Sequence, residues 1–203
     1  RDTAAYLLEL LSFSPSNILS MSWYERARAY ADGEVGMAYC ATLLAPMFEL
    51  NPASPAHGVT EYLPLPSGLN ARPLAPLGGY ALAIPSNVAE NRIDPIWTAL
   101  TSLSSAQAIK LYIENGSLVS PRFSVSMDPE VSKISPVISK VDEMARFGVL
   151  QMWPRPPVPE ISKIIAIVGE EMHDMLVGVK SIDEALMNSQ NRADALMRRH
   201  GHY

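Results

Sequence analysis

The chain has 203 residues, 48% of them hydrophobic and 18% charged, which is typical of a folded protein with a buried core and not of a disordered chain. Its formal net charge is −5, its isoelectric point is near 5.4, and Arg198-Arg199 is its largest basic cluster. This charge distribution argues against nucleic acid and against anionic membranes as partners. The single cysteine, Cys40, rules out an internal disulfide and a zinc site built from several cysteines.

The first residues lack the features of a translation start. The chain opens at Arg1 without a Met and without a basic-then-apolar signal segment, and it enters helical sequence almost at once. We therefore expect part of a longer protein, and the missing signal says nothing about its compartment. No apolar run reaches the roughly 18 residues that a membrane-spanning helix needs.

The first half of the chain predicts three helices and three short strands. Apolar residues at helical spacing predict a helix that begins near Asp2 and ends at Ser14. Ser22 and Glu25 stand three apart, as in a capping box, and predict a helix that stops at Gly33. The other expected elements are a short helix over 42–50 and strands over 35–39, 59–65 and 77–84.

The second half is predicted to be mainly helical. Asp94-Pro95 should start one helix with Asp as its cap, and Ser181 with Glu184 forms a second capping box. Few short strands between many helices indicate an α/β domain, rich in helix, whose sheet is incomplete in this chain. The expected helices cover 96–103, about 105–112, 129–147 with a break at Pro136, 161–178, and 182 to about 199.

No known catalytic, metal-binding or phosphate-binding motif occurs, so we predict no catalytic residue, no metal and no cofactor. Cys40 has no base near it in sequence and is better interpreted as a small buried hydrophobic residue than as a nucleophile. Glu170, His173 and Asp174 could form a metal site on one helix, but a solvated polar face is the favoured interpretation.

Aromatic and polar residues next to strand ends are the first candidate binding feature. Trp23, Tyr39, Thr42, Tyr80 and Trp153 occupy such positions. Sugars present flat C–H faces that stack on aromatic rings, and hydroxyl groups that need a few fixed polar partners. Taken one at a time, these residues are better interpreted as core positions that keep a polar tip.

Two arginines are the second candidate feature. Arg122 and Arg155 stand in proline-flanked segments predicted to be extended, and an arginine held rigidly can make several directed hydrogen bonds. A structural salt bridge would explain either residue equally well.

Six sequence fragments, in order, resemble the extracellular solute-binding proteins of family 1, the group that includes maltose-binding protein. The resemblance spans nearly the whole chain, and its strength lies in the order and spacing of the fragments rather than in any one of them. The matching fragments are 29–39 (AYADGEVGMAY), 78–85 (GGYALAIP), 96–107 (IWTALTSLSSAQ), 116–122 (GSLVSPR), 155–161 (RPPVPEI) and 176–186 (LVGVKSIDEAL).

The resemblance implies a periplasmic-binding-protein-like (type II) lobe from the C-terminal portion of an ABC-transporter sugar-binding protein. Such proteins hold a solute between two α/β lobes that close by a hinge motion, act outside the cytoplasmic membrane, and deliver the solute to a permease without chemistry. The chain departs from the family at Cys40-Ala41-Thr42, where Asn or Gly is usual. The ligand-binding residues implied are Tyr39, Thr42, Gly78, Gly79, Tyr80, Arg122, Trp153 and Arg155.

The resemblance also implies a division of the chain. Residues 1–81 and 126–203 should build the C-terminal lobe, and 82–125 should belong to the N-terminal lobe. That middle segment should then expose apolar side chains and could cause self-association. The side chains concerned are Ile96, Trp97, Leu100, Ile109 and Leu111.

Two other functions stay open at this point. A receptor of the same class for a non-sugar solute, such as an anion or a polyamine, would use the two arginines if its ligand is anionic. A small hydrolase would use Cys40 or Asp174. The sugar receptor is the leading hypothesis.

Overall fold

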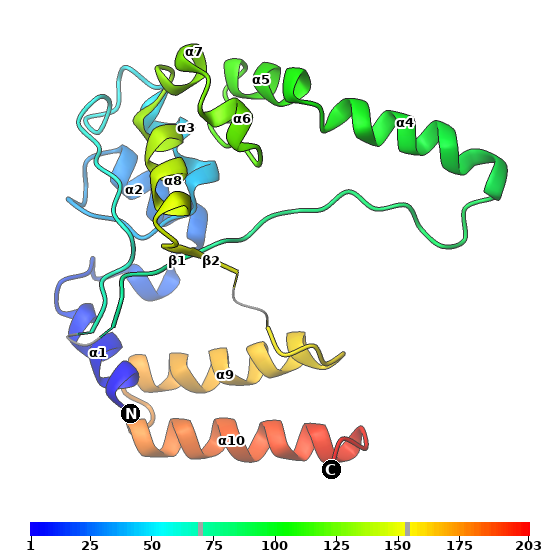
Figure 1. The fold of residues 1–203 in the computed structure, drawn as a ribbon. Helices are drawn as coiled ribbons and strands as arrows, with labels where there is room; N and C mark the ends of the chain where they lie inside the picture. The colour runs from blue at the N-terminus through cyan, green and yellow to red at the C-terminus, as the bar shows by residue number, and fades with distance from the viewer. Residues whose placement is uncertain (69–70, 153–154) are drawn as a thin grey trace. The chain divides into compact units, whose positions relative to one another are not determined.

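The computed structural model describes residues 1–68, 71–152 and 155–203 (Figure 1). The chain forms two compact units. The first, here called the terminal unit, comprises Arg1–Ser22 and Pro154–Tyr203, and the second, the central unit, comprises Trp23–Trp153. No helix in the described part of the chain is long and apolar enough to cross a membrane.

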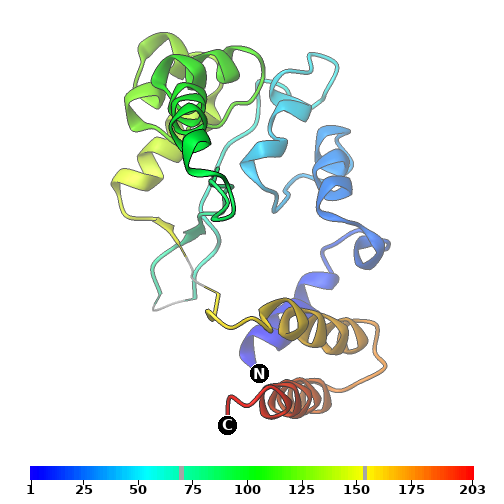
Figure 2. The same cartoon turned by 90° about the vertical axis from the view of Figure 1, so that its right-hand side faces the viewer.

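The terminal unit is built from helices, two of which lie side by side in both views (α9 and α10, Figures 1 and 2). The first of this pair ends as predicted at Gly178, whose φ of +81° lies in the left-handed region that favours glycine. Ser181 Oγ then accepts a hydrogen bond from Glu184 N–H at 3.3 Å, and the Glu184 carboxylate accepts one from Ser181 N–H at 2.8 Å, which confirms the predicted capping box. The elements are α1 (Asp2–Leu11), η1 (Ile18–Ser20), α9 (Ile161–Leu176) and α10 (Ile182–Arg199).

The central unit is also mainly helical, and side-chain caps begin several of its helices. The side chains of Ser105, Asp128 and Ser135 each cap a helix by accepting a hydrogen bond from a backbone N–H of its first turn. Asp94 does not cap its helix, because a 3-10 turn runs directly into a helix that already begins at Ile93. The helix over 123–126 was not predicted. The elements are α2 (Trp23–Ala31), η2 (Thr42–Leu44), α3 (Pro46–Glu49), η3 (Glu90–Arg92), α4 (Ile93–Leu103), α5 (Ala106–Glu114), α6 (Phe123–Ser126), α7 (Pro129–Ser132) and α8 (Pro136–Arg146).

The sheet of the central unit is minimal. Strand β1 (Ala75–Pro76) pairs in parallel with β2 (Leu150–Gln151), with Ala75 opposite Leu150. The two strands come from parts of the chain that are far apart in sequence, as expected for a parallel pair. The predicted α/β class is therefore met by a helix-rich fold with a small sheet.

The three strands predicted from the sequence are wrong. Residues 35–39, 59–65 and 77–84 form no strand. A strand needs a neighbour along its length to pair its backbone N–H and C=O groups. Among the described residues, pairing of these segments with another segment is limited to Leu65 N–H, which donates to the Leu74 carbonyl, and Leu77 N–H, which donates to the Gln151 carbonyl. Several of their apolar side chains face solvent instead: Met37 is 89% exposed and Leu82 is 65% exposed.

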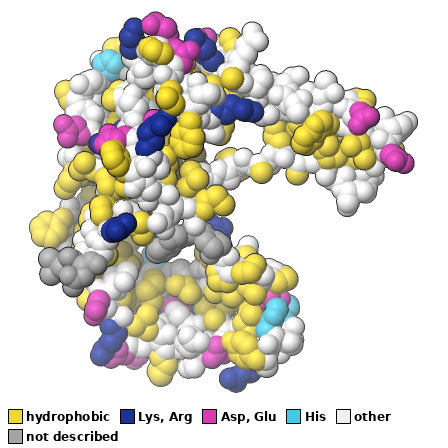
Figure 3. All heavy atoms as spheres, viewed as in Figure 1, with side chains coloured by type: hydrophobic (Ala, Val, Ile, Leu, Met, Phe, Trp, Pro, Cys, Tyr) yellow, Lys and Arg dark blue, Asp and Glu magenta, His cyan; other side chains and the backbone are white. Residues whose placement is uncertain are grey.

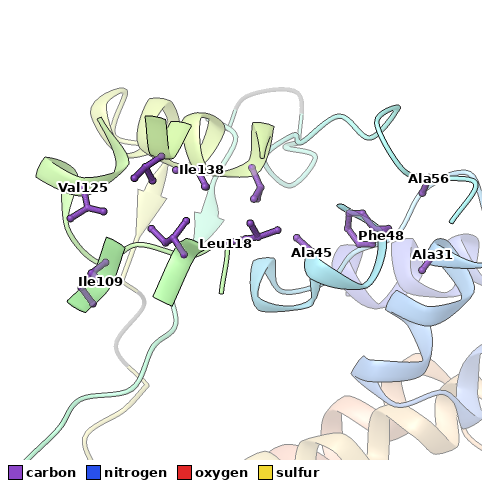
Figure 4. Close-up of a cluster of buried hydrophobic side chains, with 11 residues drawn as sticks. Ala31, Ala45, Phe48, Ala56, Ile109, Leu118, Val125 and Ile138 are labelled. Carbon is purple, nitrogen blue, oxygen red and sulfur yellow. The ribbon is translucent and has the colours of Figure 1, made fainter. Parts of the chain in front are cut away.

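The core of the central unit joins its helices (Figure 4). Phe48 of α3 is buried, and its ring meets the edge of the Tyr30 ring at a centroid distance of 5.1 Å. Ile109 of α5 also lies in this core, so the prediction that it is exposed is wrong: α5 packs against α6 and α7. Trp97 and Leu111 are exposed as predicted, and Figure 3 shows hydrophobic side chains gathered over α4.

Candidate functional site

The residues predicted to bind ligand are spread over both units. Arg155 is exposed in the terminal unit, and Trp153 lies outside the described residues. Within the described part of the chain, no hydrogen bond, ion pair or ring contact joins any two members of the predicted set. The members in the central unit are Tyr39, Thr42, Gly78, Gly79, Tyr80 and Arg122.

The segment from Tyr39 to Thr42 leads from solvent into the core. Tyr39 is 58% exposed, Thr42 begins the 3-10 turn η2, and Phe48 in the following helix is buried. Between them, Cys40 is half-buried, and burial raises the pKa of its thiol although Arg26 acts in the opposite direction. A neutral thiol is a poor nucleophile, which supports the interpretation of Cys40 as a packing residue.

The segment Gly78-Gly79-Tyr80, which has no regular structure, is fully open to solvent. Tyr80 is completely exposed, and a Cβ added at either glycine would meet no atom within 4 Å. Neither glycine has a positive φ. The central unit therefore does not itself require glycine here, and the Tyr80 ring is available as a stacking surface.

Arg122 makes a specific contact within the central unit. Its Nε donates to the backbone carbonyl of Ser104 at 2.6 Å, and its own N–H donates to Ser120 Oγ at 3.1 Å. The bond to Ser104 ties the loop before α6 to the junction between α4 and α5, and the bond to Ser120 lies within that loop. The contact gives Arg122 a structural role of the kind that the sequence left open.

A small apolar pocket lies beside the two-stranded sheet. Its lining residues are Leu65, Leu74, Pro76 and Gln151, and its volume is about 80 Å³. Ligand sites usually measure about 300–1,000 Å³ and combine apolar walls with polar groups that fix orientation. This pocket is too small and too apolar for a sugar, and none of the predicted residues lines it.

Sequence reasoning missed a buried carboxylate in the central unit. Glu49 is 8% exposed and accepts hydrogen bonds from Tyr62 Oη at 2.6 Å and from Ser135 Oγ at 3.1 Å. Burial, and then the bond to Glu49, raises the pKa of the Tyr62 hydroxyl. Two neutral hydroxyl donors satisfy the carboxylate without creating a nucleophile, so the cluster holds α3 to α8. No local signal reveals it, because Glu49 and Ser135 lie 86 positions apart.

The polar residues of α9 form an ion-pair network rather than a metal site. Glu171 is buried and accepts hydrogen bonds from Lys180, Arg192 and Asn188, which hold its pKa at about 2. Lys180 also pairs with Asp174 at 2.9 Å. Across residues 1–68, 71–152 and 155–203, no group of three or more His, Cys, Asp or Glu residues is arranged to hold a metal ion.

Comparison with known proteins relates the fold to solute-binding proteins. The chain superposes on the structure described as maltose-bound T. maritima MalE3 with a TM-score of 0.80 and 19% sequence identity. The match covers 95% of this chain and 49% of the other, so the chain spans about half the length of that protein. No family model matches the sequence, and no curated protein matches it.

This likeness assigns the chain to a class of fold. The chain has a solute-binding-protein-like fold, seen here as a fragment of a periplasmic-binding-protein-like architecture. At 19% identity the likeness establishes the fold and leaves the ligand to chemical argument.

Proposed function

We propose that the chain is part of an extracytoplasmic solute-binding component of an ABC importer, of family 1, which binds a sugar or a sugar-like solute. In this proposal the solute lies in a cleft between two lobes that close by a hinge motion, and a membrane permease receives it. The observation that carries the proposal is the superposition of 95% of the chain on half of a maltose-bound protein.

Exposed aromatic residues support a carbohydrate ligand. Tyr39 and Tyr80 present 58% and 101% of their surfaces to solvent, although tyrosine rings ordinarily bury much of their area. Both stand in segments without regular structure, where binding residues are often found. In the proposed receptor these two rings stack on sugar faces, and Thr42, Gly78 and Gly79 line the same wall.

The division of the chain is part of the proposal. Residues 1–81 and 126–203 would form one lobe, and 82–125 would contribute to the other. Within this middle segment, α5 packs into the core of the central unit, so the support for the division comes from α4. None of the residues of α4 is buried, and Trp97 on it is 61% exposed. Surface of that kind is normally covered by other protein.

The test is the melting temperature of the full product of the reading frame that contains these residues, measured with maltose, maltotriose, glucose, trehalose and a polyol. A ligand at about 100 times its Kd stabilises a protein by about 2.7 kcal/mol. We expect at least one sugar to raise the melting temperature, and Tyr80→Ala to remove most of that rise. Tyr6→Ala is the matched control: it changes a tyrosine that is 48% exposed on α1, and it should leave the ligand response intact.

The same assay separates the sugar proposal from its alternatives. If no sugar or polyol raises the melting temperature, the sugar proposal is wrong. A response to organic anions that Arg122→Ala and Arg155→Ala both abolish would instead identify a receptor for an anionic solute.

A further inference from the structure

A buried carboxylate in the terminal unit is bound by two histidines at once. Glu160 precedes the first residue of α9 and is 6% exposed. Its Oε1 lies 2.9 Å from His200 Nδ1, and its Oε2 lies 2.9 Å from His202 Nε2. Each oxygen of the buried carboxylate therefore contacts a different imidazole. An ion pair on the solvated surface would not need two partners, because water would satisfy the second oxygen.

The backbone after α10 explains how both imidazoles reach the same carboxylate. Gly201 adopts a φ of +77° and its N–H donates to the Arg198 carbonyl at 3.1 Å, while His202 N–H donates to the Met197 carbonyl at 3.1 Å. This pair of bonds is the Schellman motif, which reverses the chain at the end of a helix. Residues 200–203, here called the return segment, thus run back toward the first turn of α9.

Helices α9 and α10 form a hairpin, and the contact of Glu160 with the two histidines joins the start of α9 to the end of α10. The connection between α9 and α10 is held at Ser181 by the capping box, whereas the start of α9 and the end of α10 have no covalent link nearby. Glu160 and the two histidines join them there. We propose that the return segment is a pH-dependent latch, which mild acid closes on Glu160 and alkaline pH loosens.

The direction follows from charge. Histidine is the side chain that changes charge between pH 5 and 8. A neutral imidazole gives the carboxylate an ordinary hydrogen bond, and a protonated imidazole gives a charge-assisted one that is roughly twice as strong. Because the protonated imidazole makes the stronger bond to the carboxylate, falling pH favours the closed state. Acid strengthens the latch only while Glu160 stays ionised, because a protonated carboxyl no longer attracts the imidazolium groups. Burial raises the pKa of Glu160. Hydrogen bonds to its own backbone N–H and to His202 lower the pKa by more than burial raises it, so the pKa lies below the ordinary value of 4.5.

The other charged groups of this corner modify the effect without reversing it. Asp194 on α10 accepts a hydrogen bond from Tyr203 Oη at 2.9 Å, which holds the return segment from its far side. Arg198 and Arg199 in the last turn of α10 repel a second positive charge and weaken the latch at low pH. On α9, Lys163 is the charged residue of the first turn and acts in the same direction as the arginines. None of these groups contacts Glu160, so the two imidazoles dominate.

The test measures amide hydrogen exchange of Gly201 and His202 by NMR in the 203-residue chain, corrected for the intrinsic pH dependence of exchange, at pH 6 and pH 8. We expect their protection to rise about threefold or more on acidification, because two bonds gain charge assistance while about a third of each imidazole stays in water. The double variant His200→Gln/His202→Gln keeps polar donors but cannot be protonated, so its protection should not change with pH.

His173→Gln is the matched control, because His173 is exposed on α9 and does not touch Glu160. It should retain the full pH response, and far-ultraviolet circular dichroism should confirm the same helix content in all variants. A response below twofold in the unchanged chain, or an equal response in the double variant, overturns the latch.

Discussion

Phe48 offers the sharpest test of the central unit. Its side chain is 2% exposed and its ring packs edge-on against Tyr30 at 5.1 Å. Replacing it with Ala removes about 150 Å² of buried apolar surface, which at about 25 cal/mol per Å² corresponds to about 4 kcal/mol. That figure lies inside the range of about 3–5 kcal/mol found for the loss of a core aromatic side chain. We therefore expect Phe48→Ala to lower the free energy of unfolding of the central unit by about 4 kcal/mol.

The measurement can be made specific to this unit. Both tryptophans in the described part of the chain, Trp23 and Trp97, belong to it, so tryptophan fluorescence during urea unfolding follows the central unit. Phe147→Ala makes the same chemical change at a position that is 77% exposed, and it should alter the free energy of unfolding by less than about 0.5 kcal/mol. Equal losses in the two variants, or a loss below about 1.5 kcal/mol for Phe48→Ala, would refute the placement of the core.

Three further predictions concern polar groups. Because the pKa of Glu171 falls from 4.5 to about 2 on folding, its contribution to stability is complete above about pH 4.5 and is lost as pH falls toward 2; acid unfolding monitored by circular dichroism should show this window, and Glu171→Gln should abolish it. Ser181→Ala removes the capping box and should cost about 1 kcal/mol in thermal unfolding, whereas Ser162→Ala, exposed on α9, should cost less than about 0.5 kcal/mol. Tyr62→Phe removes one of the two hydroxyl donors to Glu49 and should cost about 1–3 kcal/mol in urea unfolding; a neutral result would mean that water replaces the hydroxyl.

The helices could be predicted because their signals are local. Ser181 and Glu184 stand three apart, and both hydrogen bonds of the capping box are present. The end of α9 at Gly178 likewise follows from a single residue with a positive φ. Each of these features lies within one turn of helix, so sequence spacing alone determines the geometry.

The strands and the candidate site could not be predicted in the same way. An apolar run over 77–84 predicts a strand only if a partner extends along it. Among the described residues, its pairing with β2 stops at its first residue, where Leu77 N–H donates to the Gln151 carbonyl. From the sequence alone, Arg122 is equally consistent with a ligand contact and with a structural residue. Its bond to the Ser104 carbonyl, 18 positions away, depends on how α4 and α5 meet, which no local pattern shows. No local sequence pattern marks Glu49 as a buried carboxylate, because its donors come from distant segments.

The exposed tyrosines add a physical requirement to the sugar proposal. An aromatic ring that stacks on a sugar must be held in one orientation, and that hold normally comes from packing and hydrogen bonds around it. Tyr39 and Tyr80 have no such support within the central unit, since 58% and 101% of their surfaces are exposed. In the proposed receptor the missing support has to come from the ligand and from further protein surface. Sugar binding and the ordering of these two segments should therefore occur together, and a sugar should stabilise the full-length product more than it stabilises residues 1–203 alone.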